Sequence, residues 1–96
     1  MKGQKEFKDI KEIRDSIDEI DFQILQLFGE RNHCAEKIIN FKTDKAEVIA
    51  KKRQEEMLAL RRKWAKDFNL NPDLFEKIFK MLINSNIKKQ MEMLER

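Results

Sequence analysis

A seven-residue apolar repeat runs from Ile10 to Lys42 and restricts this part of the chain to one kind of structure. Two sets of positions three residues apart form the repeat: Ile10, Ile17, Ile24, Arg31 and Ile38, with Ile13, Ile20, Leu27, Cys34 and Phe41. Interleaved sets of this kind are typical of a helix that packs its seam against other helices. Asp9 and Glu12 have capping-box spacing for its start. The pattern predicts one very long helix over 10–42.

Two shorter helices are expected after the long one. Capping-box spacing begins again at Asp44 and indicates a helix over 46–68. The pair Asn71-Pro72 is a typical helix start and indicates a third helix over 72–94. The 96 residues include only two Gly and one Pro, too little turn chemistry for many short strands. The sequence predicts an all-α fold of three helices in a single domain over 1–96.

The long helix needs more cover than its own chain provides. Its 33 residues span about 50 Å, whereas a chain of this length has a radius of gyration of about 13 Å when folded. Two shorter helices cannot cover apolar surface on both sides of it. A second copy has to, with apolar burial worth about 25 cal/mol per Å² favouring the association. We therefore expect an intertwined homodimeric helical bundle.

Charge and composition limit the partners. The net charge of +3, from 21 basic and 18 acidic residues, suits a small anionic ligand at least as well as nucleic acid. No apolar run of about 18 residues is present, and the N-terminus lacks the apolar segment of a signal peptide. The single Cys34 excludes an intrachain disulfide and fits a reducing compartment. We expect a cytoplasmic protein with no nucleic-acid and no membrane partner.

Polar residues interrupt the predicted apolar faces at four positions, which are Arg31, Arg53, Asn86 and Gln90. A buried guanidinium needs an anionic partner. The partner is either an internal carboxylate or an anionic ligand, and a polar residue in a seam also sets helix register in coiled coils. No acidic residue lies on the same stripes, which favours a small dicarboxylate as the ligand.

Two further cationic residues extend this set. Lys42 follows Arg31 by eleven residues, so the two project from nearly the same helix face about 16 Å apart. Arg14 precedes Arg31 by about 26 Å along the helix and reaches the same small ligand only from a second chain. The alternative for Arg14 is a solvated ion pair with Asp18 at i+4. Such a pair stabilises a helix by about a few tenths of a kcal/mol.

Other chemistry has little support in the sequence. The adjacent His33 and Cys34 point in different directions on a helix, which disfavours a metal site, and Cys34 is interpreted as a small buried apolar residue. Trp64 and Phe68 are interpreted as core. No nucleophile–base pair, Gly-rich phosphate loop or zinc spacing is present, so we expect no metal and no cofactor. An enzyme made of these residues acts by positioning and electrostatics.

Arg14, Arg31, Lys42, Arg53 and Gln90, in this order on three helices, resemble the all-helical chorismate mutase superfamily. The resemblance extends from about Asp9 to Gln90, and its most specific stretch is Ile13-Arg14-x-x-Ile17-Asp18-x-Ile20-Asp21. In detail the chain is similar to the isochorismate-pyruvate lyase branch, which makes salicylate. The stretches that carry this likeness include Gly29-x-Arg31, Phe41-Lys42, Ala50-x-x-Arg53, Trp64-Ala65 and Ile87-x-x-Gln90.

The resemblance implies a site shared between two chains. Each of two equivalent sites takes Arg14 from the other protomer, and Arg14, Arg31 and Arg53 hold the two carboxylates of the substrate. The catalytic residues are Lys42 and Gln90, which donate hydrogen bonds to the ether oxygen of the bond that breaks. Both reactions of the superfamily are taken to be pericyclic, so neither needs a general base.

The chain also departs from the mutase pattern. Mutases usually carry an acidic residue where Ala50 stands and a Glu where Gln54 stands, and these groups are associated with the ring hydroxyl of chorismate. Asn86 stands where mutases often have a hydroxyl residue. Gln54 and Asn86 are therefore predicted as substrate-binding residues, and Ala50 favours isochorismate as the substrate.

Three functions follow as hypotheses. The first is an isochorismate-pyruvate lyase, with weak chorismate mutase activity compatible with Gln54. The alternative is a chorismate mutase that forms prephenate. The third, from another class, is a non-catalytic helical dimerisation or nucleic-acid-binding module, which only the basic runs 51–53 and 61–63 support.

Overall fold

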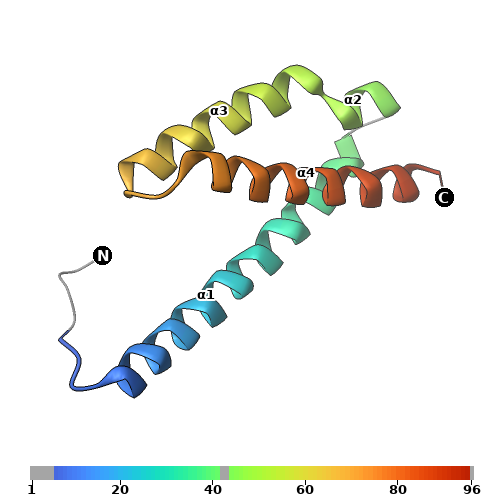
Figure 1. The fold of residues 1–96 in the computed structure, drawn as a ribbon. Coiled ribbons are helices and arrows are strands. Elements are labelled where there is room, and N and C mark those ends of the chain that lie inside the picture. Colours follow the sequence, from blue (N-terminus) through green and yellow to red (C-terminus); the bar gives the residue numbers. More distant parts are fainter. Residues whose placement is uncertain (1–5, 42–43, 96) are drawn as a thin grey trace. The chain divides into compact units, whose positions relative to one another are not determined.

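The computed structural model describes residues 6–41 and 44–95 (Figure 1). In chain order the elements are α1 (Ile10–Lys37), the 3-10 turn η1 (Ile38–Phe41), α2 (Lys45–Ile49), α3 (Lys51–Asp67) and α4 (Pro72–Leu94). The described residues contain no strand, so the all-α prediction is confirmed. Across 6–41 and 44–95, every helix is too short or too polar to cross a membrane.

These elements form two units, Met1–Asn32 and His33–Arg96, and the boundary falls within α1. In the first unit, Asp9 Oδ1 accepts a hydrogen bond from the Glu12 N–H at 3.0 Å. The Glu12 carboxylate in turn accepts from the Lys8 N–H at 2.6 Å. Since the first N–H groups of a helix have no intrahelical partner, this exchange stabilises the start of α1 where the sequence predicts it.

The apolar stripe of α1 is open to solvent in the single chain. No residue of α1 is buried, and Ile24 and Leu27 of the stripe have 42% and 61% of their surface exposed. Exposed apolar area of this extent is unfavourable in water by about 25 cal/mol per Å². α1 therefore offers a long surface that another helix would stabilise by covering.

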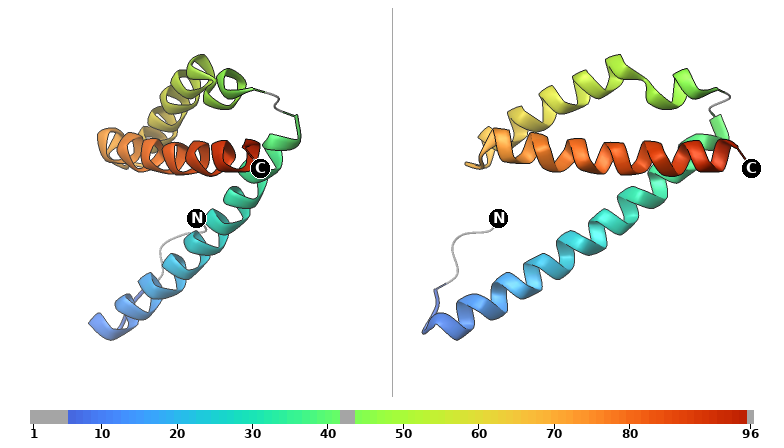
Figure 2. Two further views of the ribbon diagram at one scale, coloured as in Figure 1. Left: turned by 90° about the vertical axis from the view of Figure 1, so that its right-hand side faces the viewer. Right: turned by 45° about the vertical axis from the view of Figure 1, so that its right-hand side comes forward.

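In the second unit, α3 and α4 form an antiparallel hairpin closed by residues 68–71 (Figures 1 and 2). Asn71 Oδ1 accepts hydrogen bonds from the N–H groups of Asp73 and Leu74 at 3.0 and 3.3 Å. Pro72, which has no N–H to satisfy, takes the first helical position, as predicted. Asn69 adopts a φ of 60°, which Asn tolerates better than most residues.

An ion-pair cluster ties the closed end of the hairpin together. Arg62 of α3 donates a hydrogen bond to Asp73 of α4 at 2.8 Å and lies 3.5 Å from Glu76. The hydrogen bond from Asp73 raises the pKa of the Arg62 guanidinium. Between the helices, Ala65 and Ile83 are the buried apolar residues of α3 and α4. A small apolar core and the ion pairs of Arg62 thus stabilise the hairpin.

The single helix predicted over 46–68 is divided in two by Ala50. This residue has φ 43° and ψ 60°, a left-handed conformation that costs a non-glycine residue about 1–2 kcal/mol. The break lets α2 turn back beside α4 (Figure 2), where Val48 is only 6% exposed and Lys45 lies 3.9 Å from Glu95. Burial of Val48 therefore explains why the structure has two helices, α2 and α3, where the sequence predicts one.

Three residues predicted as core are exposed in the single chain. Trp64 and Phe68 lie at the end of α3, where Phe68 has 73% of its surface exposed, and Cys34 is also exposed. The prediction of burial is wrong for the isolated chain because α3 and α4 cover only the sides that face each other. These apolar groups remain available for contact with another surface.

Candidate active site

The predicted site residues are distributed over both units. Arg14 and Arg31 belong to α1 within Met1–Asn32. The four in the second unit are Arg53 and Gln54 on α3, with Asn86 and Gln90 on α4. Lys42 lies outside the described residues, so its placement stays a prediction.

Arg31 is the half-buried cation of α1. Desolvation lowers the pKa of its guanidinium below the ordinary value, because partial burial disfavours the charged form. The side chain nevertheless stays protonated at any physiological pH. A cation kept partly out of water in this way interacts more strongly with an anionic ligand than a fully hydrated cation does.

Arg14 is exposed in the first turns of α1. The i,i+4 ion pair in this region joins Lys11 to Asp15 at 2.8 Å. Within residues 6–41 and 44–95, Arg14 makes no ion pair, so the alternative pairing with Asp18 is not observed. The guanidinium is accessible to a ligand or to another chain.

Arg53 occupies the first turn of α3 and is exposed. It has no ion pair with any carboxylate in the part of the chain that the structure describes. The alternative of an internal structural ion pair is therefore not observed at this position. An exposed guanidinium with unused N–H groups is suited to a ligand carboxylate, which it can bind through two parallel hydrogen bonds.

Gln54 is half-buried beside the break between α2 and α3. Its Nε2 donates a hydrogen bond to the carbonyl oxygen of Ile49, the last residue of α2, at 2.5 Å. Its backbone N–H donates to the carbonyl of Ala50 at 3.0 Å. The Gln54 side chain, which the sequence predicts to bind substrate, is therefore already hydrogen-bonded to the backbone of its own chain.

Gln90 is the most deeply buried polar residue of the predicted set, with 5% of its surface exposed. Its Nε2 donates a hydrogen bond to the carbonyl oxygen of Ala35, in the last turns of α1. A primary amide has two N–H donors, so one remains after this bond. The contact fixes the orientation of the amide and leaves a donor for a ligand.

The predicted polar residues of the hairpin lie at similar levels along its two helices. Gln54 precedes Phe68 by 14 residues, and Asn86 follows Pro72 by 14 residues. Because both helices rise about 1.5 Å per residue from the same turn, the first turn of α3 and Asn86 are at the same level. Gln90 is one turn further along α4, toward Glu95, which lies 3.9 Å from Lys45 of α2.

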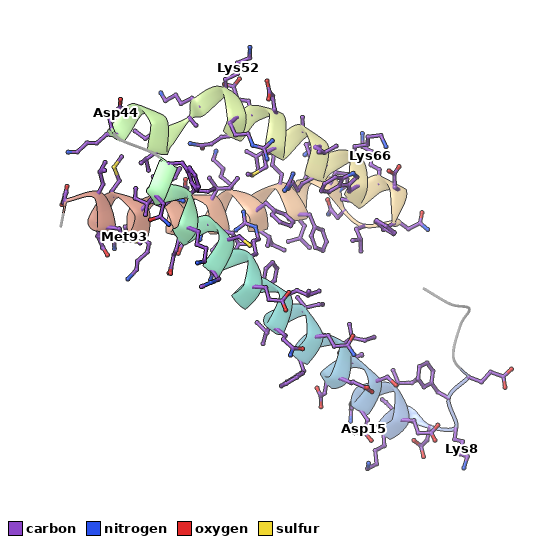
Figure 3. The ribbon with its side chains drawn as sticks, turned by 180° about the vertical axis from the view of Figure 1, so that it is seen from behind. Lys8, Asp15, Asp44, Lys52, Lys66 and Met93 are labelled. Carbon is purple, nitrogen blue, oxygen red and sulfur yellow. The ribbon has the colours of Figure 1, made fainter. Side chains whose placement is uncertain are left out.

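The lysines of α3 are exposed to solvent. Figure 3 shows Lys52 and Lys66 on the side of α3 that points away from α4, and both are exposed. Lys63 pairs with Asp67 at 2.9 Å. The lysines of the basic runs of α3 are thus solvated, whereas Arg61 is half-buried over the rings of Trp64 and Phe79.

A pocket at the closed end of the hairpin differs chemically from the predicted site. Its walls are mostly apolar and include Trp64, Phe68, Phe75 and Phe79, with the Arg61 guanidinium 4.9 Å from the Trp64 ring centre. None of the predicted site residues line it. A mostly apolar surface is unsuited to a dicarboxylate. Among the described residues, no three His, Cys, Asp or Glu side chains are grouped so that they could hold a metal ion.

Comparison with known proteins decides the family. The family model described as chorismate mutase type II matches residues 13–91. The chain belongs to the type II chorismate mutase family. It is 30% identical over 92 residues to the isochorismate pyruvate lyase of Pseudomonas aeruginosa, covering 96% of this chain and 91% of that protein. It is 37% identical over 87 residues to the chorismate mutase of Methanocaldococcus jannaschii, covering 90% and 88%.

Membership of the type II chorismate mutase family makes this chain an enzyme and confirms the resemblance found in the sequence. The matched range includes every predicted site residue from Arg14 to Gln90. The two named relatives carry different activities, so the family identifies the type of enzyme and leaves the reaction to be inferred.

The sequence of this type II chorismate mutase family member did not predict two backbone groups at the site. They are the carbonyl oxygens of Ala35 and Ile49, which accept hydrogen bonds from Gln90 and Gln54. Backbone carbonyls carry no signature in side-chain pattern, because every residue has one. A buried glutamine on an apolar face was the available signal, since a buried amide needs a partner.

Proposed function

We propose that this enzyme is an isochorismate-pyruvate lyase, which cleaves isochorismate into salicylate and pyruvate. The observation that carries the proposal is the chemistry at positions 50 and 54. Ala50 has no polar side-chain atom, and the Gln54 amide is hydrogen-bonded to the Ile49 carbonyl. Neither position offers the acidic group that the mutase pattern associates with the ring hydroxyl of chorismate.

The cationic residues are suited to the two carboxylates of the substrate. Arg31 is partly desolvated, and Arg14 and Arg53 are exposed without ion pairs among the described residues. Guanidinium groups bind carboxylates through paired, charge-assisted hydrogen bonds. In our proposal they hold the enolpyruvyl side chain over the ring, so that binding fixes the reactive geometry.

Catalysis in this proposal rests on donors to the ether oxygen. Gln90 has one amide N–H beyond its bond to the Ala35 carbonyl, and Lys42 is assigned the second donor. As the ether C–O bond breaks, negative charge grows on this oxygen, and fixed donors stabilise that charge more than they stabilise the ground state. Isochorismate contains all the atoms of salicylate plus pyruvate, so the reaction needs no co-reactant.

The proposed enzyme is an intertwined homodimer in which Arg14 enters the site of the partner. The exposed apolar stripe of α1 supports this, because a second copy would cover it. Charge is complementary as well: residues 10–21 hold five acidic and two basic residues, whereas 59–67 hold four basic residues and one acidic residue. Opposite charges of this kind orient two protomers during association.

A chorismate mutase is the second candidate. The likeness to the Methanocaldococcus jannaschii enzyme favours it, and the Gln54 amide is a neutral counterpart of the glutamate expected in mutases. This candidate requires Gln54 to leave the Ile49 carbonyl and contact the substrate.

The test supplies purified full-length enzyme with isochorismate and chorismate in separate reactions. Salicylate is followed by its fluorescence, pyruvate by a coupled assay and chorismate by its absorbance. We expect kcat/KM for isochorismate to exceed that for chorismate by at least about tenfold, a difference of 1.4 kcal/mol in transition-state binding. Rapid loss of chorismate with isochorismate unchanged would establish the mutase instead. Binding to DNA with a steep salt dependence and no turnover of either substrate would favour the non-catalytic module.

A further inference from the structure

The junction of α2 and α3 holds a conformation that its own residue does not favour. Ala50 has φ 43°, a region where the β-carbon crowds the following carbonyl oxygen. The other described non-glycine residue with positive φ is Asn69, whose side chain suits such turns. Ala has no such property, so the conformation at Ala50 must be imposed by its surroundings.

Two hydrogen bonds from a single residue enclose this turn. The Gln54 side chain donates to the carbonyl just before Ala50, and the Gln54 backbone N–H donates to the carbonyl of Ala50 itself. On the other side, Val48 is buried and keeps α2 in place. The left-handed residue is thus fixed between an apolar anchor in α2 and an amide anchor in α3.

We infer that Gln54 is a positioning residue, whose amide holds the left-handed turn at Ala50 and so orients the first turn of α3 that carries Arg53. The role of Arg53 as a carboxylate ligand rests on the proposed function, whereas the role of Gln54 toward Ala50 does not. This assignment replaces the expectation that Gln54 contacts the ring hydroxyl of the substrate.

The position requires a neutral donor. A Glu at position 54 has only acceptor atoms when ionised and would face the acceptor oxygen of Ile49. A protonated Glu can donate, so the folded state would raise the pKa of this carboxyl. Since a raised pKa stabilises the fold below the unfolded pKa of about 4.3, the turn in Gln54→Glu is held at low pH and lost as pH rises through the folded pKa.

The decisive experiment is a double-mutant cycle on Gln54→Met and Ala50→Gly. Glycine adopts left-handed conformations without the β-carbon penalty, so Ala50→Gly is expected to compensate for the missing amide. Hydrogen exchange of the backbone N–H groups of residues 48–54, measured by mass spectrometry in the full chain, reports the turn without any substrate. Glu55→Met serves as the control at an exposed neighbouring position.

We expect Gln54→Met to speed this exchange at least about tenfold and to raise KM several-fold with a smaller change in kcat. Adding Ala50→Gly should return both quantities to within about threefold of wild type, and Glu55→Met should change neither. In Gln54→Glu, exchange corrected for its intrinsic pH dependence should slow toward the wild-type rate as pH falls to about 4.

Three results would overturn the inference: unchanged exchange in Gln54→Met, no compensation by Ala50→Gly, or faster chorismate turnover by Gln54→Glu at neutral pH. The last would show that position 54 contacts the substrate. If isochorismate is not a substrate, the exchange measurements still decide the role of Gln54, so the two proposals fail separately.

Discussion

Replacing Gln90 with Met is expected to lower kcat by about 100-fold or more while KM changes little. Met preserves the length and flexibility of the side chain and removes both amide donors. Loss of one fixed donor to a developing oxyanion typically costs about 10²–10³ in kcat. A group that acts in the transition state and not in substrate binding lowers kcat and kcat/KM together.

The same change has a structural cost that must be separated from the catalytic one. Gln90 is buried, and its loss leaves the Ala35 carbonyl without this donor, a penalty of about 1–3 kcal/mol. Urea unfolding gives this value, and activity is measured well below the melting temperature. Lys89→Met, at the exposed neighbouring position, is the matched control. A Gln90→Met enzyme that keeps its kcat despite lower stability would assign the residue a structural role alone.

Local sequence signals predicted those parts of the fold that depend on local interactions. The heptad pattern predicted one helix over 10–42, whereas α1 ends at Lys37 and the 3-10 turn η1 follows over 38–41. The side-chain caps at Asp9 and Asn71 lie where their spacing places them. Caps act over three or four residues, so their energetics are contained in the sequence that forms them.

The parts that were missed depend on contacts between elements. The segment around Ala50 has good helix formers, and its break follows from burial of Val48 and the hydrogen bond between Gln54 and Ile49. Trp64 was expected in the core because an apolar pattern specifies a face to be covered, without specifying which chain covers it. Both errors concern contacts between elements, which local preference does not encode.

The sequence predicted which residues belong to the candidate site better than it predicted their hydrogen-bond partners. Arg53 was recognisable because a cation interrupts an apolar pattern, and the described residues give it no ion pair. Gln90 was recognisable because it interrupts an apolar face, and Gln54 was predicted only through the family resemblance. The acceptors of both amides are backbone carbonyls, which no pattern identifies. Amides that are already oriented by the backbone supply pre-organised donors, as positioning catalysis requires.

Co-expression of two inactive variants, Arg14→Ala and Arg31→Ala, is expected to restore activity. In the proposed dimer each site combines Arg14 of one chain with Arg31 of the other, so a heterodimer has one site with both substitutions and one intact site. Two affinity tags isolate this heterodimer, whose specific activity should be about half that of wild type, because closed two-fold symmetry gives two sites per dimer. Each parent homodimer should retain roughly 1% or less, since removal of one charged partner costs about 3 kcal/mol or more.

The pair Arg31→Ala and Arg53→Ala provides the control for this experiment. In the proposal both residues belong to the same protomer at each site, so every site in that heterodimer has one defect and activity stays at the level of the parents. Restoration in the first pair but not in the second therefore identifies Arg14 as the residue that crosses between chains. No restoration in the first pair would mean that the two arginines of α1 act within one chain, and the exposed stripe of α1 would then need a different partner. Equal restoration in both pairs would mean that Arg53, like Arg14, comes from a different chain than Arg31, which would contradict the proposed composition of the site.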